Sequence, residues 1–269
     1  MKVVLFCGGT GSRIRYDLND TPKPLIDVCG IPIILRMMAQ YAAAGHDDFI
    51  LCAGHKIEFF NGFFSFIKER SVIELYNNEL SRIYNSPPIQ SWRIRIEDTG
   101  NVIIGERLWR IRNLLSSEEM FFANYTDVVS DININSSLRA FKEQNVIASI
   151  AAVKPSQSYH WLDASSDNDL VSNIQDQQTE DKYINGGYMC LGKGIFNFLG
   201  QGKELATDAF REIIKLKGLF AYKTDGLWKS IDTRKDLEEA ETLMIEKGQD
   251  SVLWPLTSGI YDIKRRMGL

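Results

Sequence analysis

The chain opens with MKVVLFCGGTGSRIR, residues 1–15, where a short apolar run leads directly into a glycine-rich loop. The run Val3–Cys7 contains no polar residue and predicts a strand that is buried on both faces, as in a parallel sheet. In the loop, Gly8, Gly9 and Gly11 lack the Cβ atom that would keep backbone amides away from a phosphate. The opening therefore predicts an α/β fold with a phosphate-binding loop, and a plain tight turn is the alternative.

Two common phosphate-binding fingerprints do not fit this loop. A dinucleotide-binding loop that used Gly9 and Gly11 would need glycine or alanine at the next motif position, where the chain has Ile14. A P-loop would need a Gly-Lys-Ser/Thr sequence a few residues on, and the chain has none there. The loop by itself leaves the kind of phosphate ligand open.

Short apolar runs alternate with longer amphipathic patterns through the first half of the chain. The predicted strands are Val3–Cys7, Phe49–Cys52, Met120–Tyr125 and Val146–Val153. The predicted helices are Ile33–Ala44, Glu58–Lys68, Leu108–Leu115 and Leu138–Gln144. This alternation predicts an α/β fold: a Rossmann-like, mainly parallel mixed sheet with helices on both faces.

The second half follows a different pattern. Trp161–Ser165 and Leu170–Ile174 flank a turn-like SSDND segment and predict a hairpin of inserted antiparallel strands. A strand is predicted over Tyr183–Leu191, and helices over Thr207–Leu216 and Asp236–Lys247. The chain shows no internal repeat and no low-complexity linker, so we expect a single domain over residues 1–269.

The composition argues against several functions. The net charge of −4 gives no electrostatic footprint for nucleic acid or for an anionic membrane. The opening apolar run is shorter than the roughly 7–15 residues of a signal peptide, and no stretch approaches the ~20 apolar residues of a membrane span. The dispersed cysteines and histidines show no metal-binding spacing. We therefore expect a cytoplasmic protein that binds neither nucleic acid nor a membrane.

A stiff cationic segment follows the glycine loop. In Thr21-Pro22-Lys23-Pro24-Leu25, the two prolines hold the lysine in an extended conformation. Together with Arg13 in the loop, Lys23 would present a pre-positioned positive charge of the kind that a triphosphate requires. Solvated surface charges are the alternative interpretation.

The two motifs together resemble a known signature. GGTGSR at 8–13 followed by PKP at 22–24 resembles the opening of the sugar-1-phosphate nucleotidyltransferases. Later segments are similar to one subgroup, the glucose-1-phosphate cytidylyltransferases, and they occur in the same order: WR at 92–93, DTG at 98–100, GERL at 105–108, INGG at 184–187, GLW at 226–228 and IDT at 231–233. The resemblance covers almost the whole chain.

The resemblance implies a nucleotide-diphospho-sugar transferase type of fold and an enzyme of nucleotide-sugar and polysaccharide biosynthesis. Such a nucleotidyltransferase transfers CMP from CTP to a phosphorylated small molecule, here a sugar 1-phosphate similar to glucose 1-phosphate, and releases pyrophosphate. It also implies a homo-oligomer. The chain would divide into a nucleotide-binding half (1–150), an acceptor-binding half (151–235) and a C-terminal helical tail (236–269).

The implied catalytic residues are Arg13 and Lys23, which would hold the β- and γ-phosphates and stabilise the leaving pyrophosphate. Little base catalysis is needed, because the attacking acceptor phosphate is already an anion. The other nucleotide-binding residues that the resemblance implies are Phe6, Gly8, Gly9, Gly11, Ser12, Thr99, Gly100 and Arg107.

A Mg²⁺ ion is expected beside the reacting phosphates, held by one or two carboxylates. The family takes one aspartate from the end of a central strand and another from much further along, and Asp127 and Asp232 match by position. Asp127 lies in Thr126-Asp127-Val128, where the family has glycine on both sides, which predicts a changed backbone or a bulkier pocket floor. Asp131 is an alternative ligand, and N-capping of the last helix is the alternative role of Asp232.

The acceptor half departs most from the family. Asn185 and Gly186 would face the acceptor's hydroxyl groups, and Trp161 and Gln177 would complete its site. Gln177 stands where the family has a lysine that binds the acceptor phosphate, and an amide cannot neutralise charge. Lys154 and Lys182 are candidate replacements.

A second departure from the family lies upstream of Gln177. Here the chain has His160-Trp161, where the family has a pair of small residues. Both changes lie on the acceptor side, whereas Arg13 and Lys23 are present. This asymmetry predicts an altered acceptor, which would be another sugar phosphate, a non-sugar phosphate or a phosphonate.

A non-catalytic nucleotide-binding relative is a second interpretation of the sequence, favoured by Gln177 and the altered 126–128 segment. A dinucleotide oxidoreductase is a third, and Ile14 counts against it.

The proposed homo-oligomer has one candidate interface in the sequence. A helical face carries Phe59, Phe60, Phe63, Phe64 and Ile67. Burial in the core explains these residues better than an exposed interface does.

Overall fold

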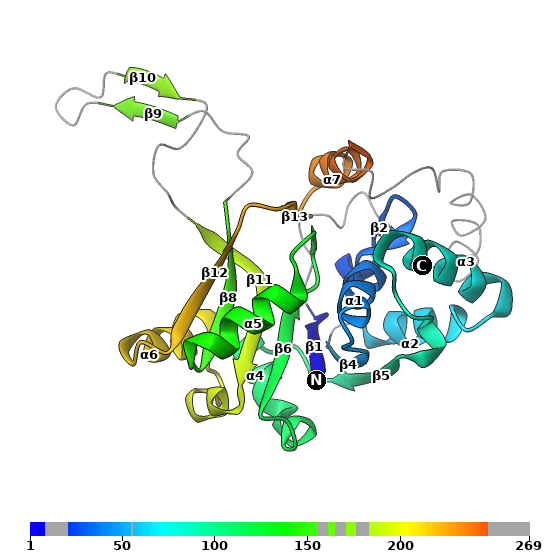
Figure 1. The fold of residues 1–269 in the computed structure, drawn as a ribbon, viewed down its shortest axis with the longest axis horizontal. Helices are drawn as coiled ribbons and strands as arrows, with labels where there is room; N and C mark the ends of the chain where they lie inside the picture. Colours follow the sequence, from blue (N-terminus) through cyan, green and yellow to red (C-terminus); the bar gives the residue numbers. More distant parts are fainter. Residues whose placement is uncertain (9–20, 55, 155–160, 165–170, 176–182, 247–269) are drawn as a thin grey trace.

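A seven-stranded sheet forms the centre of the fold, with the strand order β12-β8-β11-β6-β1-β4-β5 (Figure 1). The computed structural model describes residues 1–8, 21–54, 56–154, 161–164, 171–175 and 183–246, with the backbone alone for 161–164 and 171–175. The strands of this sheet are β1 (Lys2–Phe6), β4 (Asp48–Ala53), β5 (Arg93–Asp98), β6 (Met120–Tyr125), β8 (Ala148–Val153), β11 (Ile184–Gly192) and β12 (Leu219–Thr224).

The sheet is mainly parallel, as predicted. Strand β1 pairs in parallel with β4 on one side and with β6 on the other, and β4 pairs in parallel with β5. Strand β12 is parallel to β8, while β11 runs antiparallel to both of its neighbours, β6 and β8. The carboxyl ends of all the strands except β11 therefore meet at one edge of the sheet, and the amino end of β11 joins them there.

Alternate residues of β1 point into two different cores, because successive side chains of a strand face opposite sides. Val3 and Leu5 pack with the helices of one face, and Val4 and Phe6 pack with those of the other. The first face carries α1 (Ile33–Ala43), α2 (Ile57–Phe66), α3 (Arg70–Tyr84) and α5 (Ile134–Gln144). The second carries α4 (Ile104–Arg110) and α6 (Phe210–Lys215). Figure 1 shows the two groups flanking the sheet.

Smaller elements surround the carboxyl edge. Three antiparallel pairs are β2 (Asp27–Val28) with β3 (Ile31–Pro32), β7 (Val128–Ser130) with β13 (Trp228–Ser230), and β9 (Trp161–Ala164) with β10 (Val171–Gln175). The last helix is α7 (Arg234–Glu246). Short helical turns occur at Lys23–Leu25, Ile89–Ser91, Arg112–Leu115, Lys193–Phe198 and Leu205–Ala209. The β9–β10 pair confirms the predicted hairpin.

The phenylalanine-rich face of α2 belongs to the core, as expected. Phe60, Phe63 and Phe64 are buried and pack with Trp92 and the residues of α3. Their burial leaves the expected homo-oligomer without its candidate interface, so oligomerisation stays a prediction. Within the described part of the chain, no helix has the length and apolar character needed to cross a membrane.

A buried arginine ties together the ends of neighbouring strands. The Arg107 guanidinium donates hydrogen bonds to the carbonyl of Val102 at 2.8 Å and to Thr99 Oγ1 at 3.3 Å. It also reaches the carbonyl of Ala53, which ends β4, at 3.4 Å. A Cβ atom on Gly8 would lie 1.8 Å from the Arg107 nitrogen Nη1. Glycine is therefore required at position 8, because the Arg107 side chain lies too close to leave room for a Cβ atom.

A nearly buried lysine connects β13 to α7. Lys229 is 5% exposed, and its ammonium lies 2.6 Å from Glu239 Oε2 and 3.2 Å from Asp236 Oδ1. Burial lowers the pKa of Lys229, but its hydrogen bonds to the two carboxylates outweigh this effect and raise it. The hydrogen bond from Lys229 also holds the pKa of Glu239 below its ordinary value of 4.5. This contact fixes the start of α7 against the rest of the fold.

Gly8→Ala should destabilise the protein by about 1–3 kcal/mol, because the added methyl group overlaps the Arg107 guanidinium and forces it to move. Chemical denaturation would measure the loss. Gly62→Ala is the control, since the space around Gly62 in α2 is open, and there the change should stabilise the helix by about 0.5–1 kcal/mol. Equal effects of the two variants would contradict the role given to Arg107.

Lys229→Met should lower stability by about 1–2 kcal/mol at pH 7, less than for a fully buried pair because both carboxylates keep some exposure. Lys235→Met removes an exposed lysine that pairs with the same Glu239, and should change stability by less than ~0.5 kcal/mol. Because the pKa of Glu239 is lowered in the folded state, its contribution is present above pH 4.5 and disappears as the pH falls further. Chemical denaturation should show that the loss of stability in Lys229→Met is smaller at pH 4 than at pH 7.

Candidate functional site

The residues predicted for the site lie along the carboxyl edge of the sheet. Gly8 follows β1, Thr99 follows β5 and Asp127 follows β6, while Asn185 lies at the start of β11 at the same edge. Strand order therefore sets the spatial order: β5 and β1 lead into predicted nucleotide residues, β6 leads into Asp127, and β11 carries the predicted acceptor residues Asn185 and Gly186. Ligands of open α/β sheets commonly bind at this edge.

Lys23, Asp127 and Asp232 converge at the middle of the edge. The Lys23 ammonium lies 2.5 Å from Asp232 Oδ1 and 3.5 Å from Asp127 Oδ2. The lysine side chain is 16% exposed, whereas the two carboxylates keep 38% (Asp127) and 37% (Asp232) exposure. The Lys23 ammonium thus lies beneath two carboxylates that remain open to solvent. Lys23 and Asp232 meet in this cluster although they are 209 positions apart in the sequence.

Asp232 reaches the cluster through the β7–β13 ladder. Ser230 pairs with Val128, and the amide of Ile231 donates to the carbonyl of Asp127 at 2.8 Å. These backbone bonds place the residue after Ile231 beside Asp127. The two aspartates are therefore brought together by secondary structure and not by side-chain contacts alone.

The alternative role of Asp232, as the N-cap of the last helix, is wrong. Thr233 fills that position: its hydroxyl accepts a hydrogen bond from the amide of Asp236, and the Asp236 carboxylate accepts from the amide of Thr233 in return. This reciprocal pair is a capping box. Because another residue caps α7, the Asp232 carboxylate is directed toward Lys23.

Asp131, the alternative metal ligand, lies elsewhere. A Cβ atom on Gly226 would lie 2.0 Å from Asp131 Oδ1, so this carboxylate packs directly against the Gly226 backbone. The amide of Asp131 donates to the carbonyl of Leu227. Asn133, and not Asp131, caps α5, because its side chain accepts from the amide of Ser136.

The electrostatics of Asp127 reflect its position. Partial burial raises the pKa of Asp127, the Lys23 ammonium lowers it, and the neighbouring Asp232 carboxylate raises it. Two carboxylates that face one cationic atom, each more than one-third exposed, fit a Mg²⁺ ion, which takes one or two carboxylates and completes its shell with water or phosphate oxygens. No group of three potential ligands from His, Cys, Asp and Glu forms among the described residues.

The substitutions beside Asp127 are accommodated without strain. Neither Thr126 nor Val128 has a positive φ angle, so neither position demands glycine. Thr126 is buried and donates its hydroxyl hydrogen to the carbonyl of Phe6 at 2.8 Å, and Val128 pairs within the β7–β13 ladder. The floor is bulkier than two glycines would make it, as expected, while the backbone conformation is ordinary.

A cavity of about 230 Å³ opens beside the cluster. The described residues that line it are Phe6, Cys7, Gly8, Lys23, Pro24, Ile104, Tyr125, Thr126 and Asp127. Burial raises the pKa of Cys7 to about 12, so its thiol stays protonated and is not a nucleophile. Phe6, Gly8, Lys23 and Asp127 were predicted from the sequence, whereas Tyr125 and Ile104 were not. An aromatic residue at the end of a buried strand, two positions before Asp127, was the available signal for Tyr125.

The remaining predicted nucleotide residues lie behind this cavity. Thr99 is buried and bonds through its hydroxyl to the carbonyl of Ala53, and Gly100 turns the chain with a φ of 71°. Arg107 is also buried, at 2% exposure, and burial lowers its pKa. These three residues form a wall that supports Gly8 and do not line the cavity themselves.

The predicted acceptor residues adjoin the cavity on the other side. Asn185 is exposed and its Oδ1 accepts a hydrogen bond from the amide of Gly187. Burial raises the pKa of Tyr125, which lines the cavity, and the nearby Asn185 side chain lowers it. The indole nitrogen of Trp228 donates to the carbonyl of Gly186 at 2.8 Å. Both Asn185 and Gly186 therefore lie next to Tyr125 or Trp228, within reach of a ligand that extends from Asp127 toward β11.

Several predicted residues lie outside the part of the chain that the structure describes. They are Gly9, Gly11, Ser12, Arg13 and Gln177, together with the side chain of Trp161 in β9. Their roles stay predictions from the sequence.

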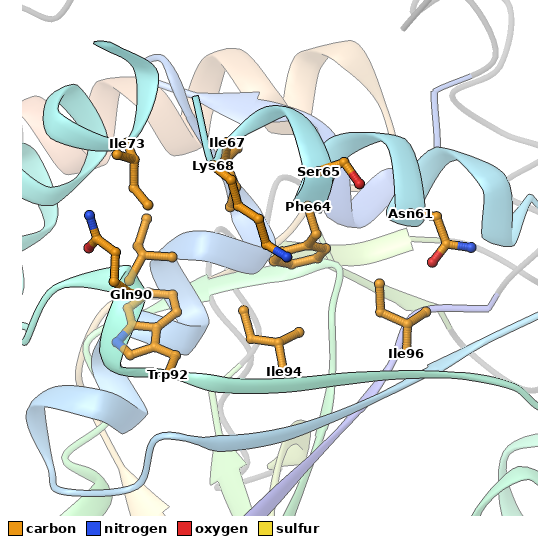
Figure 2. A pocket seen from close by; sticks show the side chains of 11 residues that line it. Asn61, Phe64, Ser65, Ile67, Lys68, Ile73, Gln90, Trp92, Ile94 and Ile96 are labelled. Carbon is orange, nitrogen blue, oxygen red and sulfur yellow. The ribbon is translucent and has the colours of Figure 1, made fainter. Parts of the chain in front are cut away.

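A larger cavity, of about 740 Å³, lies between α2 and the edge strand β5 (Figure 2). Figure 2 shows Ile94 of β5 beneath Phe64 and Ile96 beneath Asn61. Its lining is mostly apolar and includes no carboxylate and none of the predicted site residues. The smaller cavity beside Lys23 is therefore the candidate active site.

Comparisons with known proteins agree with this placement. No family model matches the chain. Glucose-1-phosphate cytidylyltransferase of Salmonella typhi is 26% identical over 253 residues, which cover 93% of this chain and 97% of the relative. Mannose-1-phosphate guanylyltransferase 1 of Arabidopsis thaliana is 22% identical, over 96% of this chain and 69% of the relative. The crystal structure of an apo UDP-glucose pyrophosphorylase has the same fold, with a TM-score of 0.65 at 16% identity over 92% of this chain and 99% of that one.

Over nearly its full length this chain is thus similar in sequence to sugar-1-phosphate nucleotidyltransferases, and it has the fold of solved members of that group.

Proposed function

We propose that this protein transfers CMP from CTP to a phosphorylated small molecule and releases pyrophosphate. The observation that carries the proposal is the convergence of Lys23, Asp127 and Asp232 beside a cavity at the carboxyl edge of the sheet. Phosphoryl and nucleotidyl transfer depend mainly on positioning and charge neutralisation, and this cluster provides a cation and two carboxylates at one point. The acceptor's phosphate supplies the nucleophile.

Asp127 and Asp232 would hold a Mg²⁺ ion, which, when bound, neutralises charge on the reacting phosphates. Lys23 would donate to phosphate oxygens of the triphosphate, because its ammonium lines the cavity and is held on the turn Lys23–Leu25 between two prolines. Arg13 would do the same from the glycine loop. Gly8 would bring its backbone close to the nucleotide, supported from behind by Arg107.

CTP is proposed as the nucleotide because the cytidylyltransferase of Salmonella typhi covers both chains nearly completely, whereas the guanylyltransferase of Arabidopsis thaliana is covered over 69% of its length. The acceptor is proposed to differ from glucose 1-phosphate, because Gln177 cannot replace the charge of a phosphate-binding lysine. Hexose 1-phosphates other than that of glucose, non-sugar phosphates and phosphonates are the candidate classes.

Pyrophosphate release with Mg²⁺ tests this proposal directly. CTP, UTP, GTP, ATP and dTTP would each be combined with sugar 1-phosphates, phosphonates, phosphorylated amino acids and phosphorylated polyols. We expect release with CTP and with an acceptor other than glucose 1-phosphate. Efficient turnover of glucose 1-phosphate would contradict the proposed change of acceptor. The proposed nucleotidyltransferase activity would still stand. CTP binding without release from any pair would support the non-catalytic relative instead.

Asp232→Asn should lower kcat/KM at least 100-fold and weaken Mg²⁺ binding, because the amide keeps the shape of the side chain but loses the charge that a hard cation requires. Asp127→Asn should have a similar effect. Asp131→Asn distinguishes the alternative ligand and should change turnover by less than about threefold, since Asp131 packs against Gly226. Asp48→Asn, at the opposite end of the sheet, is the control for a general charge effect. Normal turnover of Asp232→Asn would remove this residue from the site.

A further inference from the structure

A single cation lies between the two carboxylates of the candidate site. The Lys23 ammonium is 2.5 Å from Asp232 Oδ1 and 3.5 Å from Asp127 Oδ2, and the lysine side chain is only 16% exposed. Among the residues that the structure describes, neither aspartate forms an ion pair with any other cation. Lys23 is therefore the counter-ion of this carboxylate pair within the described part of the chain.

The same two carboxylates fit a Mg²⁺ ion, and the ammonium already pairs with both of them. Because Mg²⁺ binds carboxylate oxygens at ~2.0–2.1 Å, a Mg²⁺ ion on Asp232 Oδ1 would lie less than ~5 Å from the Lys23 ammonium. Two cations at this separation repel each other. The carboxylate oxygens that accept from the lysine are also those that a metal would use. The ammonium and the metal therefore compete for the pair.

Lys23 can move its ammonium without moving its backbone. The residue begins the helical turn Lys23–Leu25 and lies between Pro22 and Pro24. The amide of Ile26 donates to the carbonyl of Lys23 at 3.0 Å, which fixes the backbone at the end of this turn. The four-carbon stem of a lysine is flexible, and its ammonium is a compact charge. The side chain alone can therefore change its partner.

The adjacent cavity offers this ammonium a second anionic partner. Lys23 lines the cavity together with Gly8 and Asp127, so a phosphate bound there lies beside the same lysine side chain. When the ammonium turns from the carboxylates to a phosphate, it exchanges one anion for another. The two carboxylates lose their counter-ion in that exchange. Because each is more than one-third exposed, a hydrated metal ion can then reach them.

We propose that Lys23 is an internal counter-ion, which blocks Mg²⁺ from Asp127 and Asp232 until a triphosphate draws the ammonium away. This inference rests on the proposed function and adds a coupling to it, because nucleotide and metal favour the same position of Lys23. In the free protein, the apparent affinity for metal falls in proportion to the fraction of molecules whose lysine is withdrawn. By linkage, bound metal strengthens triphosphate binding by the same factor.

Metal binding to the protein without nucleotide tests this role of Lys23. Mn²⁺ takes the same oxygen ligands as Mg²⁺, and its paramagnetic resonance signal reports the free ion during a titration. Calorimetric titration with Mg²⁺ gives a second measurement. We expect Lys23→Met to bind either metal at least about tenfold more tightly than the unmodified protein, because the competing charge is gone. Lys23→Arg keeps the charge and should stay within about threefold of the unmodified protein.

Two further variants show where the metal binds. Asp232→Asn, added to Lys23→Met, should abolish the gained affinity, because the carboxylate pair is then incomplete. Lys215→Met removes an exposed lysine of α6 that pairs with Glu212, and should change metal affinity by less than about twofold. This control excludes a general effect of net charge. Thermal unfolding of each variant would show that the fold is kept.

A crystal structure with Mg²⁺ and a non-hydrolysable CTP analogue tests the movement of the lysine. We expect the Lys23 ammonium to lie more than about 4 Å from Asp232 Oδ1, beyond ion-pair distance. It should instead lie within hydrogen-bond distance of a phosphate oxygen, with the metal on the carboxylates.

Equal metal affinity of Lys23→Met and the unmodified protein would overturn the proposal, as would the absence of measurable metal binding in both. A lysine that stays between the carboxylates in the complex with nucleotide and metal would overturn it as well. Failure of the proposed function has a different signature: Lys23→Met would gain metal affinity, while no pair of nucleotide and acceptor released pyrophosphate. The metal titration therefore separates the counter-ion role from the chemistry.

Discussion

Parallel pairing of β1 between β4 and β6 is the constraint on which the rest of the structure depends. Val3, Val4, Leu5 and Phe6 of β1 are buried and point alternately to both faces, so the strand can only occupy the centre of a covered sheet. Its parallel neighbours then end at the same edge, and the segments that follow them meet there. Gly8 and Asp127 become neighbours of one cavity because their strands are adjacent.

A second, antiparallel ladder completes the site from the other end of the chain. The β7–β13 pair begins directly after Asp127 and places Asp232 beside it. The capping box of Thr233 with Asp236, and the contact of Asp236 with Lys229, hold the segment that carries this carboxylate. Lys23 lies between two carboxylates that would otherwise repel one another. The cluster is thus stabilised by its own charges before any substrate binds.

The two halves of the edge differ in how firmly they are built. On the nucleotide side, Arg107 bonds to strand ends and loops and leaves no space at Gly8. On the acceptor side, Asn185 at the start of β11 and the neighbouring Ile184 are exposed.

The sequence by itself determined the fold class, the hairpin and most strands, because buried strands and amphipathic helices have distinct periodicities. It missed helix α3, although its buried positions Val72, Ile73, Tyr76 and Leu80 have helical spacing, and it missed β5 and β12, whose exposed faces dilute the apolar signal. The motifs identified Lys23 and both aspartates. Only the tertiary structure decided that Asp232 faces Lys23 instead of capping α7 and that Arg107 supports Gly8 from behind. Each of these depends on contacts between residues far apart in the chain, and such contacts leave no local pattern in the sequence.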